Sequence, residues 1–396
     1  MHPIPCLPET RPEDVGLSSA RLARIRDALA REVARGRLPG AVALVARHGR
    51  LAWFDSLGVL DPATGAPMGH DAIFRIYSMT KPIVSVAVMM MFEEGRLLLE
   101  DPISKYLPEF ATQAVAIEHD GRVELVAAAR PATVQDLLRH TSGLGYEFTG
   151  ESAVQRMYSD AALTDQSQTN AQIVSRLAEL PLMHPPGSRW EYGRSTDVLG
   201  RLLEVLSGQS LGEHLRSRVL EPLGMVDTAF HVPAAHHHRI AEPFDTDPDG
   251  GGDVRLIGVR QPPALEFGGG GLVSTATDYA RFLKMLLDGG ELDGTRLLGR
   301  KTIEFMTSDH LGAIPCSSDI LPTGYGFGLG FAVRLQDGIA AVPGSAGQYH
   351  WGGIAGTTFW VDPRERLFAL MMCQAPKQRD EFRPLFRDLV YAAIVD

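Results

Sequence analysis

The spacing of hydrophobic positions changes several times along the chain of 396 residues. Residues 17–35 carry apolar side chains at helical spacing after two serines, which predicts an amphipathic helix that begins at a serine cap. Residues 40–58 alternate instead, and His48-Gly49 stands between their two apolar runs. This second pattern predicts a β-hairpin with a tight turn.

Residues 78–94 are apolar on nearly every face of a helix below its first turn, and Gly95 follows them. A helix without a polar face is typical of the centre of a protein. We therefore expect a buried helix here that ends at the glycine.

Strand patterns nearly vanish between residues 106 and 261 and return toward the carboxyl end. Helices are expected at residues 134–139, 172–180, 196–206, 211–219, 276–288 and 381–393, and strands at 325–335, 357–361 and 367–372. Strands at both ends of the chain around a helical middle predict an α+β fold. We expect one sheet domain built from residues 1–105 and 262–396, and a mostly helical domain built from residues 106–261.

Charge and composition disfavour several classes of protein. The formal net charge of -10 and the lack of a basic run argue against binding to nucleic acid or to an anionic membrane surface. The longest strongly apolar run, residues 83–92, is far shorter than the ~20 residues of a membrane span, and the amino-terminal segment lacks a basic start followed by an apolar stretch. Three cysteines without a C-x-x-C pair are too few for a disulfide framework. We therefore expect a cytoplasmic protein with reduced thiols.

Candidate chemistry begins at Ser78-Met79-Thr80-Lys81, the only S-x-x-K in the sequence. Pro82 lacks an N–H and is tolerated only in the first turn of a helix, so Ser78 must lie where the buried helix starts. Residues three apart on a helix share one face, with about 5–6 Å between their Cβ atoms, and the Lys81 amine can therefore reach the Ser78 hydroxyl. A helix start also offers unpaired N–H groups to a developing oxyanion. The alternative is that Ser78 only caps a core helix while Lys81 extends to solvent.

A serine hydroxyl is a poor nucleophile unless a neighbouring base takes its proton. An unperturbed lysine has a pKa of about 10.4, so Lys81 is a base at neutral pH only if burial lowers its pKa by several units. A tyrosine that exchanges one proton with the lysine relaxes this demand. We therefore expect a tyrosine beside the pair.

Five motifs in order resemble the serine β-lactamase and penicillin-binding protein superfamily. They are Ser78 to Lys81, Asp136 to Leu144 (DLLRHTSGL), Pro186-Gly187-Ser188 leading to Tyr192, Pro222 to Met225 (PLGM) and Trp351-Gly352-Gly353. The resemblance covers the chain from Leu17 to its end and is greatest to the family VIII carboxylesterases. It implies an antiparallel sheet flanked by helices, an all-helical domain beside it and an active site in the cleft between them, without a metal or a cofactor.

Carried over position by position, the resemblance makes Ser78 the nucleophile and Lys81 its general base or the partner of that base. Tyr192 matches the tyrosine of the Y-x-N box, which takes up and returns protons. The oxyanion hole would consist of the backbone N–H groups of Ser78 and Ile354.

The third box departs from that of a β-lactamase, because Trp351-Gly352-Gly353 stands where K-T-G is expected. In the family the lysine of K-T-G helps to hold the carboxylate of a β-lactam, whereas Trp351 supplies an apolar wall that is typical of the esterases. Arg194 stands in place of the asparagine of Y-x-N, and His350 precedes the tryptophan. Arg194, His350 and the Trp351-Gly352-Gly353 box are the expected substrate-binding residues.

Other motifs have simpler interpretations. Residues 208–212 match G-x-S-x-G, but they follow a helix instead of a strand, so Ser210 is interpreted as the cap of the next helix, with a capping box. Three consecutive histidines at 236–238 cannot converge on one metal ion. Glycines 268–271 open no phosphate-binding motif, and we expect them to allow close backbone packing. His140 is expected to be structural.

The sequence thus predicts a serine carboxylesterase that hydrolyses short-chain carboxylic esters through an acyl-enzyme on Ser78. A β-lactamase, a D-amino-acid peptidase or an acyltransferase on the same scaffold is an alternative, as is a binding module that keeps the fold without catalysis. The expected partner is a small-molecule ester, with a β-lactam as a weak second substrate. The physiological ester and the oligomeric state do not follow from the sequence.

Overall fold

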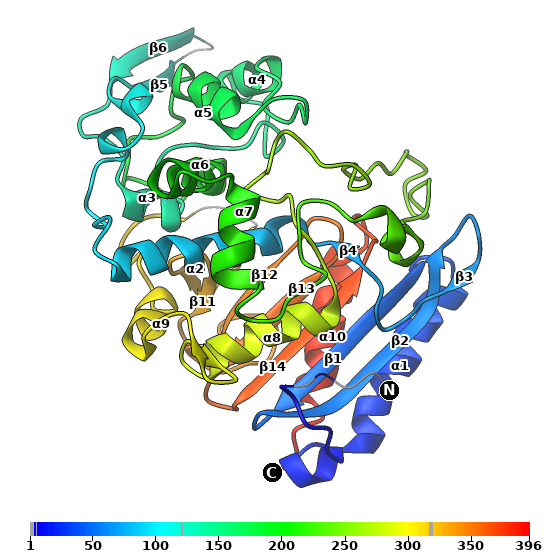
Figure 1. The fold of residues 1–396 in the computed structure, drawn as a ribbon. Helices are drawn as coiled ribbons and strands as arrows, with labels where there is room; N and C mark the ends of the chain where they lie inside the picture. The colour runs from blue at the N-terminus through cyan, green and yellow to red at the C-terminus, as the bar shows by residue number, and fades with distance from the viewer. Residues whose placement is uncertain (1–3, 5, 120–121, 317–319) are drawn as a thin grey trace.

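The computed structural model describes residue 4 and residues 6–119, 122–316 and 320–396. Their largest element is an antiparallel sheet of eight strands (Figure 1). Its spatial order is β10 (Tyr325–Phe327), β11 (Ala332–Arg334), β12 (Tyr349–Gly352), β13 (Thr358–Asp362), β14 (Leu367–Cys373), β1 (Gly40–Arg47), β2 (Arg50–Asp61) and β3 (Ala66–Pro67). Strands from the two ends of the chain therefore lie side by side, because β1 pairs with β14.

The hairpin of β1 and β2 confirms the prediction for residues 40–58. Its turn residues His48 and Gly49 both have positive φ, 53° and 73°. Two such residues let a tight turn follow the twist of the strands that it joins. All of β1 is buried, so helices cover this strand on both faces.

One face of the sheet is covered by α1 (Ser19–Ala34) and α10 (Arg379–Tyr391), which share an apolar cluster with it. The Ser18 hydroxyl caps α1 by accepting the Arg21 N–H at 3.3 Å, as the serine pattern predicts. The two ends of the chain thus build one helical layer.

The other face is covered by α8 (Ala276–Leu287), beyond which lies α2 (Thr80–Glu93) (Figure 1). Every residue of α2 from Thr80 to Met91 is buried, which confirms the predicted central helix. A short pair of strands, β4 (Phe74–Arg75) and β7 (Val273–Ser274), leads the chain into it. The strand pair fixes the chain just before α2, and α2 itself packs against the helices of residues 195–215.

Those helices are α3 (Val134–Leu138), α4 (Ala153–Asp160), α5 (Asn170–Ala178), α6 (Ser195–Ser207) and α7 (Leu211–Leu215). The same region also contains a hairpin that the sequence analysis does not expect, β5 (Ala114–His119) paired with β6 (Arg122–Ala127). Most of its residues are exposed or half-buried, so it lacks the run of buried apolar positions that identifies a strand. The division into two domains at residues 105/106 and 261/262 stays a prediction.

Two further details differ near the carboxyl end. The predicted strand at residues 325–335 is two short strands, β10 and β11, separated at Gly330, whose φ is 98°. A small hairpin of β8 (Glu291–Leu292) and β9 (Thr295–Arg296) and the helix α9 (Arg300–Met306) are additional. Among the helices that the structure describes, none is both long enough and apolar enough to cross a membrane.

Candidate active site

Ser78 lies in a 3₁₀ turn, Tyr77–Met79, that runs directly into α2. Tyr77 has a φ of 43°, a left-handed conformation that is strained for a tyrosine and costs about 1–3 kcal/mol. Its hydroxyl oxygen accepts the N–H of Ile257 at 2.9 Å, and the Met79 carbonyl accepts the hydroxyl of Tyr279 at 2.9 Å. The residues on both sides of the serine are thus held in place, while Ser78 itself is only half-buried.

Lys81 is one turn further along the same helix, with 1% of its surface exposed. Its Nζ atom lies 3.3 Å from Ser78 Oγ, 3.0 Å from the Tyr146 hydroxyl oxygen and 2.6 Å from the Gly269 carbonyl oxygen. The three acceptors match the three N–H donors of an ammonium group. The reach from Lys81 to Ser78 that helix geometry predicts is confirmed.

Electrostatics around Lys81 decide the direction of its pKa shift. Burial lowers the pKa of Lys81, but Tyr146, Tyr192 and Asp197 outweigh burial and raise this pKa above its usual value. On balance, burial therefore does not lower the pKa of Lys81 in these surroundings, which is the condition for Lys81 alone to act as the base; its role as general base or as the partner of that base stays a prediction. As an ammonium, Lys81 donates hydrogen bonds to its neighbours and stabilises negative charge that develops on them.

Tyr192 comes from a loop far from Ser78 in sequence, yet its hydroxyl donates to Ser78 Oγ at 2.7 Å. The Tyr192 ring lies in a nest of aromatic side chains, with ring centroids 5.0 Å from His140, 5.2 Å from Trp351 and 5.3 Å from Tyr146. The residue before Tyr192 is fixed by a hydrogen bond, since the Glu191 N–H donates to the His140 carbonyl at 2.8 Å. The phenolic oxygen is thus fixed within proton-transfer distance of the serine.

The motif of residues 136–144 supports this arrangement structurally. Thr133 caps α3 in a capping box with Asp136, whose carboxylate also accepts the Thr141 hydroxyl at 2.7 Å and pairs with Arg130 and Arg139. His140 is buried, and burial holds its pKa well below 6.5. A neutral ring packed against Tyr192 fits the structural role expected for His140.

Tyr146 is a site residue that the sequence analysis misses. It follows the DLLRHTSGL motif by two positions, which is the only signal that marks it. Its ring stacks on that of Phe148 at 4.7 Å, and burial raises the pKa of its hydroxyl. A buried, protonated phenol beside the Lys81 ammonium extends the hydrogen-bonded network beyond the serine.

Arg194 lies behind Tyr146 and is fully buried, with 0% exposure. Its guanidinium forms an ion pair with Glu147 and lies 5.0 Å from the centroid of the Tyr146 ring. Its Nη1 is 3.8 Å from Asp197 Oδ2. The structure thus places Arg194 against Tyr146 and Asp197, two of the residues that surround Lys81.

Gly269 joins this network to Lys81. The Asp197 carboxylate accepts the Gly269 N–H at 2.7 Å, and the Gly269 carbonyl accepts from Lys81. A Cβ atom at position 269 would lie 2.7 Å from Asp197 Oδ1 and 3.0 Å from the Tyr146 hydroxyl. The close backbone packing expected for glycines 268–271 is found at Gly268, where a Cβ atom would lie 2.7 Å from the Thr196 carbonyl oxygen, whereas Gly270 has ordinary space, with its nearest atom at 3.6 Å.

The box Trp351-Gly352-Gly353 ends strand β12 beside the serine turn. Trp351 is buried, and its indole meets the Tyr192 ring edge to face. A Cβ atom at Gly353 would lie 2.3 Å from the Ile76 carbonyl oxygen, so only a glycine lets this strand end approach the residues before Ser78. The turn that follows is closed by the Gly356 N–H, which donates to the Gly353 carbonyl at 3.0 Å, and Ile354 within it is 41% exposed.

Other candidates lie elsewhere. His350 packs edge to face against Tyr325, and burial together with Arg387, Arg383 and Arg334 holds its pKa well below 6.5. Ser210 caps α7 by accepting the Glu213 N–H at 3.2 Å, as expected, but the expected capping box is not formed, since the Glu213 carboxylate pairs with Arg216 at 2.8 Å. In the described part of the chain, no group of three or more histidine, cysteine, aspartate and glutamate residues is arranged to hold a metal ion.

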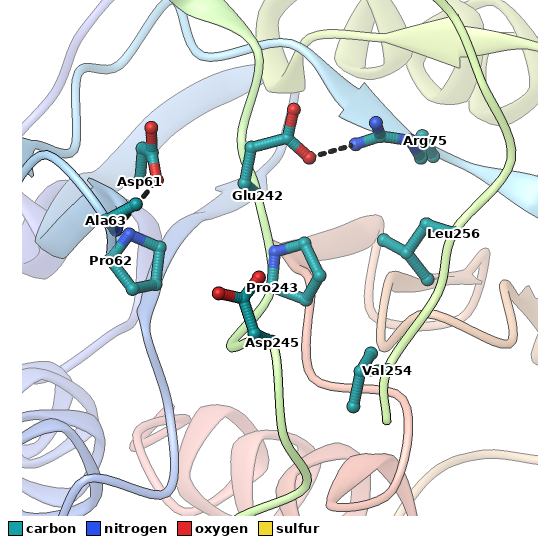
Figure 2. Close-up of a pocket in the computed structure, with 9 residues that line it drawn as sticks. All are labelled: Asp61, Pro62, Ala63, Arg75, Glu242, Pro243, Asp245, Val254 and Leu256. Carbon is teal, nitrogen blue, oxygen red and sulfur yellow. Dashed lines mark hydrogen bonds and ion pairs between the residues drawn. The ribbon is translucent and has the colours of Figure 1, made fainter. Parts of the chain in front are cut away.

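A pocket of about 210 Å³ opens beside the strand that leads to Ser78 (Figure 2). Arg75, Glu242 and Leu256 are among its lining residues. The Arg75 guanidinium is paired with Glu242 at 2.9 Å and donates to the Ala241 carbonyl at 3.1 Å. Its charge is thus already compensated within the protein.

Comparisons with known proteins agree with this architecture. A family model described as Beta-lactamase matches residues 25–392. The chain is 36% identical over 349 residues to protein Rv1367c of Mycobacterium tuberculosis, covering 86% of each chain. It is 33% identical over 406 residues to esterase EstB of Burkholderia gladioli, covering 96% of this chain and 98% of EstB. The solved structure of EstCE1, described as a hydrolase with promiscuous acyltransferase activity, matches with a TM-score of 0.79 and 27% identity, covering 94% of this chain and 98% of EstCE1.

Proposed function

Because the chain belongs to the β-lactamase family of serine hydrolases, with its likeness to the family VIII carboxylesterases, we propose that it hydrolyses short-chain carboxylic esters through an acyl-enzyme on Ser78. The contact of Ser78 Oγ with both Tyr192, at 2.7 Å, and Lys81, at 3.3 Å, is the observation that carries this proposal. It supplies a nucleophile, a group that exchanges its proton and a cation beside them.

In the proposed acylation, Ser78 Oγ attacks the ester carbonyl carbon and forms a tetrahedral intermediate. In the proposed reactive form Tyr192 is ionised, a phenolate beside the Lys81 ammonium. Its oxygen accepts the hydroxyl proton of Ser78 and then gives a proton to the alcohol oxygen as the bond to that alcohol breaks. The Lys81 ammonium stabilises the negative charge that develops while the proton is in transit. Lys81 is therefore proposed as the partner of the base, and Tyr192 as the group that accepts the serine proton.

Negative charge on the former carbonyl oxygen needs donors in fixed positions. The N–H groups of Ser78 and Ile354 are proposed as these donors. Among the turns, loops and caps of the described residues, neither N–H donates a hydrogen bond to a backbone carbonyl. The Thr357 hydroxyl donates to the Ile76 carbonyl at 3.4 Å and links the two segments, and the missing side chain of Gly353 lets them approach. In the proposed deacylation, water attacks the acyl carbonyl carbon. One proton of this water passes through Tyr192 to Ser78 Oγ, and the carboxylic acid is released.

The proposed substrate class rests on Trp351 and its neighbours. Trp351 presents an indole where the β-lactamases of the family have a lysine, so the site lacks that cation for the carboxylate of a β-lactam. Two apolar side chains near the site are exposed, Phe148 at 59% and Ile354 at 41%. Apolar groups of this kind suit the acyl chain of an uncharged ester.

The acyl-enzyme can be tested directly. We expect rapid quenching of the protein during turnover of p-nitrophenyl butyrate to leave a butyryl group on the peptide that contains Ser78, detected by mass spectrometry. The variant Ser78→Ala should carry no butyryl group, whereas Ser210→Ala, which removes the cap of α7, should be labelled like the wild type. A butyryl group on another residue of active protein would contradict the proposal.

Acyl transfer to an alcohol is a second candidate, favoured by the description of EstCE1 as a hydrolase with acyltransferase activity. The same acyl-enzyme would then be attacked by an alcohol in place of water. Adding a primary alcohol to the p-nitrophenyl butyrate reaction tests this. Formation of the alkyl butyrate, quantified by gas chromatography beside butyric acid, gives the share of each pathway.

A further inference from the structure

Arg383 extends from the first turns of α10 to the peptide that follows the Trp351-Gly352-Gly353 box. Its Nη2 atom donates to the Gly353 carbonyl oxygen and, at 3.1 Å, to the Thr357 carbonyl oxygen. A Cβ atom at Gly352 would lie 2.9 Å from the Arg383 Cζ and Nη2 atoms. The second glycine of the box therefore leaves the room that the guanidinium occupies.

The Gly353 carbonyl and the Ile354 N–H belong to one peptide group. A trans peptide is planar, and its C=O and N–H point in opposite directions; the described residues contain no cis peptide. A donor that holds the carbonyl on one side therefore also sets the direction of the N–H on the other side. A cationic donor further polarises the peptide and makes its N–H a stronger donor.

This placement of a cation is costly for folding alone. The Arg383 Nε atom is buried and has no hydrogen-bond partner among the described residues. The Nη2 atom of the guanidinium donates to backbone carbonyls. Burial and the nearby Arg379 lower the pKa of Arg383 to about 10, so the group is still charged at neutral pH. The Arg383 side chain is half-buried, and a partly buried cation that is paired with carbonyls instead of a carboxylate contributes little to stability.

We propose that Arg383 is a positioning residue of the oxyanion hole: its guanidinium holds the Gly353 carbonyl and thereby aims and polarises the Ile354 N–H toward the oxygen of the scissile carbonyl. This inference rests on the proposed acyl-enzyme mechanism and adds a residue to it. Arg383 does not touch the reacting atoms; it acts through the 353–354 peptide.

The test compares two arginines of the same helix, the half-buried Arg383 and the buried Arg387. Arg383→Met removes the guanidinium and keeps the apolar stem, while Arg387→Met removes a buried guanidinium that donates to the Tyr325 hydroxyl at 2.9 Å and lies over Trp360. For both variants, kcat and KM are measured with p-nitrophenyl butyrate, and thermal unfolding is followed. The carbonyl stretch of the acyl-enzyme is recorded by difference infrared spectroscopy with a carbon-13 label in the acyl carbonyl.

Removing a whole oxyanion donor lowers kcat by about 10²–10³-fold, and a donor that is only misaligned should lower kcat less. We therefore expect Arg383→Met to lower kcat by about 10- to 100-fold, with KM little changed. The acyl carbonyl stretch should move to higher frequency, because the carbonyl is less polarised. Arg387→Met should lower the unfolding temperature without moving either quantity. Arg383→Lys, which keeps a cation and one donor, should recover part of kcat and serves as the test if Arg383→Met does not fold.

Three results would overturn the inference while leaving the esterase proposal intact. They are an unchanged carbonyl frequency in Arg383→Met, an equal loss of kcat in Arg387→Met, and a rise in KM at constant kcat, which would mean that Arg383 binds the substrate directly. If the wild type acylates Ser78 with nitrocefin but not with the ester, the esterase proposal fails, and the infrared comparison on the cephalosporin acyl-enzyme still decides the role of Arg383.

Discussion

The Nζ atom of Lys81 lies 3.0 Å from the hydroxyl oxygen of Tyr146, a residue 65 positions away in the sequence. This contact, with those to Ser78 and Gly269, gives each proton of the buried ammonium an acceptor. A lysine held in this way is a charged, immobile donor. The two tyrosines beside it thus differ in their hydroxyl contacts, because the Tyr192 hydroxyl bonds to Ser78 and the Tyr146 hydroxyl bonds to Lys81.

Tyr146→Phe should destabilise the protein by about 1.5–3 kcal/mol, since it leaves one proton of a buried ammonium without an acceptor. Its kcat should fall less than that of Tyr192→Phe. Urea unfolding gives the stability change, and Tyr158→Phe is the matched control, because the buried Tyr158 hydroxyl donates to a neutral carbonyl, that of Pro181, at 3.1 Å. A loss in Tyr146→Phe no greater than in Tyr158→Phe would show that Lys81 does not depend on Tyr146.

Ser78→Ala should abolish ester hydrolysis while the fold is kept. Ser210→Ala should retain activity and lose about 0.5–2 kcal/mol of stability, the usual cost of removing a helix cap. Steady-state rates and urea unfolding of both variants provide the measurement. An active Ser78→Ala protein beside a folded but inactive Ser210→Ala protein would refute the assignment of the nucleophile.

Lys81→Ala and Tyr192→Phe should each lower kcat by orders of magnitude. The double variant should be only slightly slower than the slower single variant, because the two side chains serve one proton transfer. The comparison uses kcat for p-nitrophenyl butyrate in all four proteins. Losses that simply multiply would indicate two independent functions.

Esters should be turned over faster than β-lactams. A charge-assisted hydrogen bond is worth roughly 1.5–3 kcal/mol, so a site without the lysine of the third box should bind the transition state of a β-lactam about 10- to 150-fold more weakly. The measurement is kcat/KM for p-nitrophenyl butyrate and for nitrocefin on one preparation. An equal or higher value for nitrocefin would replace the esterase proposal with a β-lactamase.

Asp278 should make stability depend on pH. Burial raises its pKa to about 6 from the usual 3.8, so the folded protein holds this proton more tightly than the unfolded chain does. The unfolding free energy should therefore fall as the pH rises from about 4 to about 6 and level off above, by up to roughly 3 kcal/mol.

The neutral variant Asp278→Asn provides the control for this titration. Urea unfolding at several pH values gives its unfolding free energy. The difference between this variant and the wild type should shift in favour of the variant as the pH rises through the same interval. A constant difference between the two proteins from pH 4 to pH 7 would show that Asp278 does not titrate there.

By itself the sequence determined the parts of this protein that depend on local geometry. Residues three apart on a helix must share a face, so Ser78 and Lys81 meet wherever that helix lies, and a proline at position 82 requires the helix to start beside them. The turn at His48-Gly49 likewise follows from local backbone preferences. The burial of the helix at residues 78–94 follows from its apolar side chains.

Only the tertiary structure decided which groups surround these residues. Arg383 carries no distinguishing pattern in the sequence, and Tyr146 is marked only by its distance from a motif. Arg194 stands out in the sequence, but its contacts do not, and all three reach the site through contacts between segments far apart in the chain. The direction of the pKa shift of Lys81 depends on this surrounding set, because burial and nearby acceptors act with opposite signs. Local rules thus place the serine and its lysine, and long-range packing sets the charge that the lysine carries.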